Sequence, residues 1–66
     1  MYKVIVVKHG ELTTEITFHY RVEAFEFAEI VILQEDYIAV YIVNPNGEPL
    51  ARAHQAEGKG LIYEPN

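Results

Sequence analysis

"YIAVYIV", residues 37 to 43, predicts a strand with no charged side chain on either of its two faces. A strand with one face in water normally alternates apolar and polar residues. The two alternating sets here are Ile38, Val40 and Ile42, and Tyr37, Ala39, Tyr41 and Val43. Because neither set is charged, both faces of this strand need a cover, and we ask what supplies the second one.

Two strands are predicted before this stretch. Residues 2 to 8 are rich in β-branched side chains and end at His9-Gly10, where the glycine can supply the positive φ of a tight hairpin turn. Residues 12 to 20 alternate strictly, which is typical of a half-buried strand. The set predicted to face the core is Leu12, Thr14, Ile16, Phe18 and Tyr20.

Residues 21 to 34 predict a helix, because at 100° per residue most apolar side chains form one stripe opposite three glutamates. The stripe is Tyr20, Ala24, Phe27, Ala28 and Val31, with Phe25 and Ile32 at its side. A strand remains the alternative, because residues 30 to 32 are β-branched and no usual N-cap residue precedes the segment. The helix places Ile30 and Leu33 on the glutamate side, where a monomer would expose them to water.

The second half of the chain predicts a hairpin. Residues 44 to 47, "NPNG", are a strong reversal signal, and residues 48 to 54 return as an edge strand because Pro49 cannot donate to a ladder. Ala51 and Ala53 would form its small apolar face, which we expect on the side of the sheet that the helix does not cover. Residues 1 to 54 are thus one ββαββ domain of the α+β class, an antiparallel or mixed sheet with one helix on one face. Residues 55 to 66 are either a C-terminal tail or a short extra strand.

Composition limits the classes of function. A domain of 66 residues is marginal on its own, and without cysteine it has no disulfide to stabilise it, which favours oligomerisation. Net charge −5 repels phosphate backbones and disfavours nucleic acid as a partner. The sequence has no apolar run of about 20 residues and no signal-peptide pattern, so we expect no membrane contact and a cytoplasmic protein.

One helix covers only one face of a sheet, so the other face should bind a polypeptide. Twofold self-association is the commonest assembly, and we therefore expect a homodimer, or a higher oligomer, that also binds another protein. The predicted self-association or partner surface is Tyr37, Ala39, Tyr41, Val43, Ile30 and Leu33. The alternative is that the tyrosines merely reflect strand propensity and lie in water.

The catalytic inventory is thin. The chain lacks serine and cysteine, and its three histidines show no metal-site spacing, so we expect no enzyme, no metal and no cofactor. Glu15 and His19 share a strand face, which His54 would join if the second and fourth strands met. Gly58-Lys59-Gly60 lacks the full spacing of a phosphate-binding loop and fits a tail better.

Carboxylates suggest a further role. The predicted acidic partner-binding stripe is Glu23, Glu26, Glu29, Glu35 and Asp36, which would present carboxylates where phosphates sit in a basic groove. In its size, its acidity and its lack of catalytic groups, the chain is similar to accessory proteins of bacteriophages and mobile elements. Many of those proteins inhibit a host protein by binding it. The alternative function is a small-ligand or nucleotide-binding dimer, with tyrosines, Arg52 and histidines lining a site between subunits.

Overall fold

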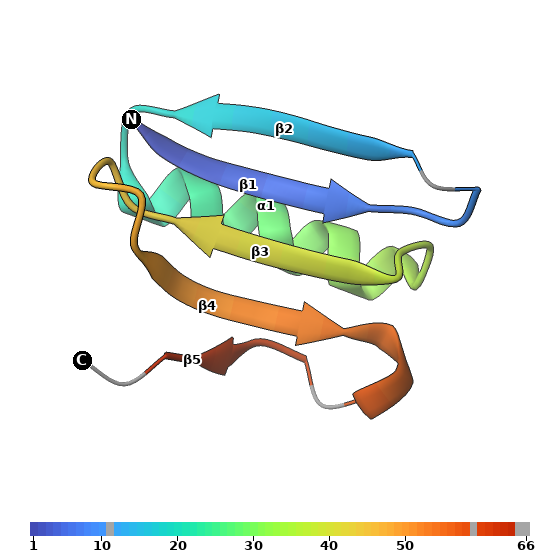
Figure 1. Ribbon diagram of the computed structural model, residues 1–66. Coiled ribbons are helices and arrows are strands. Elements are labelled where there is room, and N and C mark those ends of the chain that lie inside the picture. Colours follow the sequence, from blue (N-terminus) through green and yellow to red (C-terminus); the bar gives the residue numbers. More distant parts are fainter. Residues whose placement is uncertain (11, 59, 65–66) are drawn as a thin grey trace.

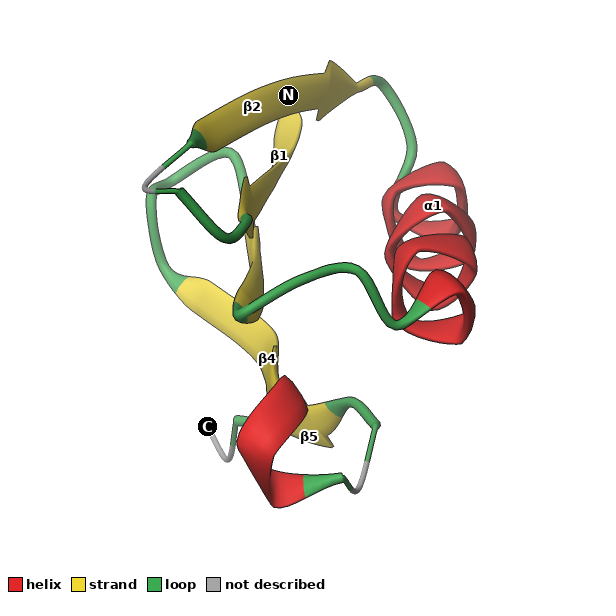
Figure 2. Ribbon diagram, turned by 90° about the vertical axis from the view of Figure 1, so that its right-hand side faces the viewer, coloured by secondary structure: helices red, strands yellow, loops and turns green. Residues whose placement is uncertain are grey.

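Strands and helix form two layers in the computed structural model, which describes residues 1–10, 12–58 and 60–64 (Figures 1 and 2). The elements are β1 (Tyr2–Val7), β2 (Thr13–Phe18), α1 (Arg21–Gln34), β3 (Ala39–Val43), β4 (Pro49–His54), the 3₁₀ helix η1 (Gln55–Glu57) and β5 (Ile62–Tyr63). The strands pair antiparallel in the order β2-β1-β3-β4-β5, with α1 packed on one face. The predicted α+β fold is confirmed, and a short fifth strand follows η1.

Helix α1 has the predicted bounds and buries Ala24, Ala28 and Val31 against the sheet. At its start the Glu23 carboxylate accepts a hydrogen bond from the Tyr20 N–H (3.3 Å), the contact that the third helical residue makes in a capping box. Tyr20 itself does not belong to the buried stripe, because it precedes the first helical turn in an extended conformation and is 68% exposed. Within the described residues, no helix combines the length and apolarity that crossing a membrane requires.

The core lies between α1 and alternate residues of the three central strands. Register pairs place these residues side by side under the helix: Val4, Val6, Val40, Ile42, Ala51 and Ala53. Two predictions are therefore wrong. Ala51 and Ala53 lie under the helix rather than on the uncovered face, and Tyr37 is a core residue at 4% exposure.

A bulge explains the position of the two alanines. Asn44 begins the predicted reversal, and its side-chain oxygen accepts hydrogen bonds from the N–H groups of Asn46 and Glu48, both at 2.9 Å. Val43 pairs with Pro49, but Ile42 pairs with Ala51, so β4 carries one extra residue. Since side chains alternate along a strand, one extra residue moves every later side chain of β4 to the opposite face.

Tyr37 is misplaced for a different reason. Strand β3 begins only at Ala39, and Tyr37 lies in the connection that follows α1. The alternation of a strand therefore does not govern its direction, and its ring joins the core cluster with Val31 and Val40. Figure 1 shows this connection leading from the end of α1 to the start of β3.

Candidate functional site

The sheet face opposite α1 is the candidate site, because the helix covers only the other face (Figure 2). Register pairs define its side chains, which we call the open face. They are Lys3, Ile5 and Val7 of β1, Thr13, Glu15 and Thr17 of β2, Ala39, Tyr41 and Val43 of β3, Arg52 and His54 of β4, and Ile62 of β5.

Apolar side chains form the middle of the open face. Ile5 pairs with Tyr41 across β1 and β3, and Val7 pairs with Ala39 in the same ladder. Val43 continues this strip, and its members other than Ala39 are only half-buried. The strip is therefore continuous along the two central strands and keeps apolar area in contact with water.

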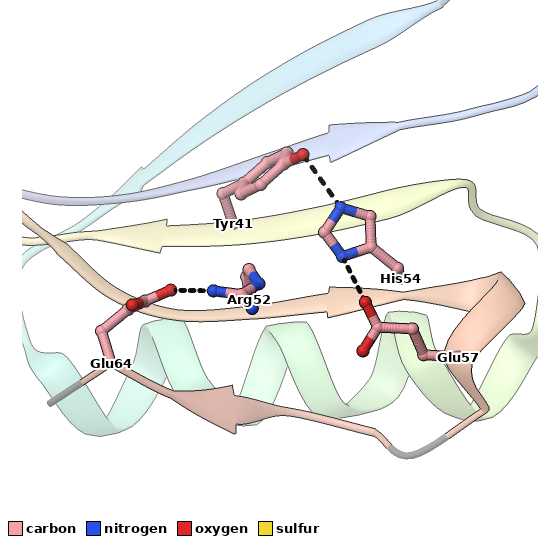
Figure 3. Close-up of polar contacts among 5 residues, drawn as sticks. All are labelled: Tyr41, Arg52, His54, Glu57 and Glu64. Carbon is pink, nitrogen blue, oxygen red and sulfur yellow. Dashed lines mark hydrogen bonds and ion pairs between the residues drawn. The ribbon is translucent and has the colours of Figure 1, made fainter.

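A chain of polar contacts borders this strip (Figure 3). The Tyr41 hydroxyl lies 3.3 Å from Nε2 of His54, and the two rings meet edge to face with centroids 5.8 Å apart. Nδ1 of His54 lies 3.5 Å from a carboxylate oxygen of Glu57, an ion-pair contact when the ring is protonated rather than a well-formed hydrogen bond. The first contact joins β3 to β4, and the second lies between the end of β4 and η1.

Charges on the open face occur in pairs. The Arg52 guanidinium binds the Glu64 carboxylate beyond β5 (Figure 3), and Lys3 lies 3.8 Å from Glu15 across β1 and β2. Each described cation of this face thus has a carboxylate beside it. The open face is close to electrically neutral, although the whole chain carries a net charge of −5.

The Tyr41–His54–Glu57 contacts have the outline of a nucleophile, a base and an orienting carboxylate. A catalytic group also needs a cavity that holds a substrate beside it. The cavities found on either side of α1 do not include these residues: one of about 190 Å³ lies toward β2, and one of about 360 Å³ lies toward β5. The Tyr41–His54–Glu57 contacts therefore lie outside both of these cavities.

Other predicted constellations are separated in the fold. Glu15 and His54 lie on β2 and β4, which β1 and β3 keep apart, so the proposed meeting of Glu15, His19 and His54 does not occur. Among the described residues, no three histidine or carboxylate side chains converge as a metal site requires. Lys59 lies outside the described residues, so the Gly58–Gly60 motif is not placed.

Predicted partner residues fall on two different surfaces. Ala39, Tyr41 and Val43 belong to the open face, whereas Ile30 and Leu33 lie on the outer side of α1 at 54% and 81% exposure. The acidic stripe Glu23, Glu26 and Glu29 is exposed on α1, and Glu35 and Asp36 are exposed just beyond it. Asp36 lies 3.9 Å from Lys8.

Sequence reasoning missed the contact between Tyr41 and His54. A hairpin without a bulge would have placed the two side chains on opposite faces of the sheet, because only the shifted register pairs Tyr41 with Arg52 and Ala39 with His54. Neither Pro49 nor the turn before it indicates in the sequence that β4 contains an extra residue.

No protein-family model, curated protein or solved structure matches the chain. Its function must therefore be inferred from geometry and charge.

Proposed function

We propose that the protein is a non-catalytic protein-interaction module that acts as a homodimer and uses the open face as its contact surface. The observation that carries this proposal is the apolar strip of Ile5, Val7, Tyr41 and Val43, which lies on the side of the sheet away from α1. Exposed apolar surface of this kind usually marks an interaction site.

Dimensions support a contact of ordinary size. The molecule measures 28 × 23 × 17 Å, and the open face is one of its two broad sides (Figure 1). A specific interface takes about 800 Å² from each partner, so a standard contact would use most of this side. At about 25 cal/mol per Å² of apolar area, its burial would also stabilise a chain too short for a large core.

Charge favours a second copy of the chain as the first partner. Two acidic helices brought together would repel, because Glu23, Glu26 and Glu29 would face the same residues of the other copy. The open face carries paired charges instead, Lys3 with Glu15 and Arg52 with Glu64, so two copies can approach there without a large repulsion.

Site-resolved NMR tests this proposal. We expect the methyl resonances of Ile5 and Val43 to shift with protein concentration, while those of Val22 and Leu33 on α1 stay constant. Val43→Lys should raise the dissociation constant of this contact at least about tenfold, because it would bury an unpaired charge. Val22→Lys is the matched control, since it adds the same charge on the exposed side of α1.

Two outcomes would contradict the proposal. Open-face resonances that do not change at any concentration would show that this surface stays in water. A response confined to the α1 methyl groups, removed by Val22→Lys and not by Val43→Lys, would instead place the contact on the helix. The predicted residues Ile30 and Leu33 would then form it.

Ligand binding is a second candidate, favoured by one observation. Tyr41, Arg52 and His54 lie on the same face of neighbouring strands, as a nucleotide site between subunits would need. Carboxylates already lie beside both cationic side chains, because Glu64 binds Arg52 and Glu57 lies 3.5 Å from His54, and these carboxylates would repel a phosphate. We therefore rank this function second.

The outward acidic stripe belongs to the same scheme. A homodimer joined through its open faces would present Glu23, Glu26 and Glu29 of both copies to the surroundings, where they would attract a basic partner. Nucleic-acid mimicry, inhibition of a host protein and a cytoplasmic location stay predictions.

A further inference from the structure

Strand β2 forms one edge of the sheet and has few of the features that usually protect an edge (Figure 1). Proteins commonly keep edge strands short or interrupt them with proline, lysine or a bulge. The opposite edge, β5, contains only Ile62 and Tyr63. β2 has six residues, "TTEITF", with no proline or basic residue, and its pairing with β1 has no register shift.

Backbone groups of β2 point away from the sheet at alternate residues. The Lys8 N–H donates to the Leu12 carbonyl at 2.8 Å, which marks a hydrogen-bonded pair beside the β1–β2 hairpin. Hydrogen-bonded and non-hydrogen-bonded pairs alternate along an antiparallel ladder. The N–H and C=O groups of Thr13, Glu15 and Thr17 therefore point outward, where another strand can bind them.

The sequence of this edge is complementary to itself. When two β2 strands pair antiparallel around Ile16, Thr14 of each copy lies opposite Phe18 of the other, and Glu15 lies opposite Thr17. No like charges then face each other, whereas a register centred on Glu15 would oppose two carboxylates. Just beyond the strand, Leu12 lies opposite Tyr20 of the second copy, and these two side chains are 66% and 68% exposed in the single chain.

A cavity beside the edge supports the same pairing. The cavity of about 190 Å³ lies between β2 and α1 and is lined by Thr14, Ile16, Phe27 and Ile30, among others. An added strand would place its own Ile16 and Phe18 on the helix side of the sheet, next to this cavity. Strand addition generally combines backbone hydrogen bonds with pockets for alternate side chains.

We propose that β2 is a second self-association site, at which it pairs antiparallel with β2 of another copy around Ile16. The pairing joins two sheets into one continuous sheet and places their open faces side by side. This contact goes beyond the proposed open-face dimer and does not depend on it. A chain that uses both surfaces forms an assembly larger than a dimer.

Amide hydrogen exchange in the Val43→Lys background tests the edge contact apart from the open-face contact, which this variant weakens. We expect the outward amides of Thr13, Glu15 and Thr17 to exchange more slowly as concentration rises, while exposed amides of α1 do not respond. Unchanged exchange up to the solubility limit would overturn the inference and leave the open-face proposal standing.

Opposite charges at Thr17 test the register. Thr17→Glu places a carboxylate opposite Glu15 of the second copy at two symmetric positions. It should raise the dissociation constant of the β2–β2 contact about fivefold. Thr17→Lys should lower it by a similar factor. Within one chain residue 17 lies opposite Lys3, so Thr17→Glu should stabilise the monomer and Thr17→Lys should destabilise it. A change in monomer stability therefore cannot mimic the expected change in the β2–β2 contact. Shifts in the same direction for both variants would refute the register centred on Ile16.

Discussion

The two faces of the sheet are built from alternate residues of the same strands, and they differ in what they bury. Under α1, the side chains of Val4, Val40, Ile42, Ala51 and Ala53 are all fully buried, and the described part of the chain buries no polar residue there. On the open face, Ile5, Val7 and Tyr41 are only half-buried and lie among paired charges.

This difference indicates separate roles for the faces. The covered face is apolar and contains small residues, Ala24 and Ala28 on α1 and two alanines on β4, so its stability depends on close packing. The open face combines polar groups that tolerate water with the apolar side chains of the contact that we propose. Substitutions on the two faces should therefore change the free energy of unfolding by different amounts. A smaller difference between the two faces would indicate that the open face is covered.

Isoleucine truncation should give the largest contrast. Ile42→Ala removes a fully buried side chain and should destabilise the fold by about 3 kcal/mol, which is a large share of the total stability of a domain this small. Ile5→Ala, on the half-buried open face, should cost about 1 kcal/mol. Urea unfolding followed by circular dichroism measures both at low concentration. An equal cost for the two variants would mean that the open face is as buried as the core.

Repeating the same measurement at high concentration sharpens the comparison. If a second copy covers the open face, the cost of Ile5→Ala should rise with concentration, whereas the difference between Ile42→Ala and the unmodified chain should grow little. A concentration-independent cost for Ile5→Ala would argue against an open-face dimer.

Adding volume should give the next largest effect. Ala53→Leu inserts atoms under the helix and should destabilise the fold by about 1–3 kcal/mol. Ala39→Leu is the control, since Ala39 is also buried, at 3% exposure, but lies on the open face, where the larger side chain can extend into solvent. Its effect should stay within about 0.5 kcal/mol. Thermal unfolding of both variants measures this difference, and a similar loss for Ala39→Leu would reveal a cover over the open face.

Ion pairs should give the smallest effects. Lys3 and Glu15 are 43% and 55% exposed, so Lys3→Met should change the free energy of unfolding by less than about 0.5 kcal/mol. Arg52→Met should cost somewhat more, up to about 1 kcal/mol, because Glu64 is better shielded from water. Unfolding at low and high salt measures both. A larger, salt-insensitive cost for Lys3→Met would indicate that the pair is desolvated by a partner.

Much of the architecture was predictable from local patterns. The 3.6-residue spacing of Ala24, Ala28 and Val31 defined the helix and its bounds, and "NPNG" defined the reversal between β3 and β4. Within residues 37 to 43, apolar side chains occupy both alternating sets, and this pattern correctly predicted a strand of which the helix covers only one face. Of the predicted site, Ala39, Tyr41 and Val43 lie together on the open face, while Tyr37 does not.

What the sequence determined by itself is the set of elements, because periodicity and turn residues act over short distances. What only the tertiary structure decided is which face each side chain of β4 occupies. One extra residue between Pro49 and Ala51 shifts the pairing with β3, buries two alanines under α1 and brings His54 to Tyr41. The shifted pairing is stabilised by packing of the two alanines against α1, which lies far from β4 in the sequence. A local sequence pattern does not show contacts between such distant segments.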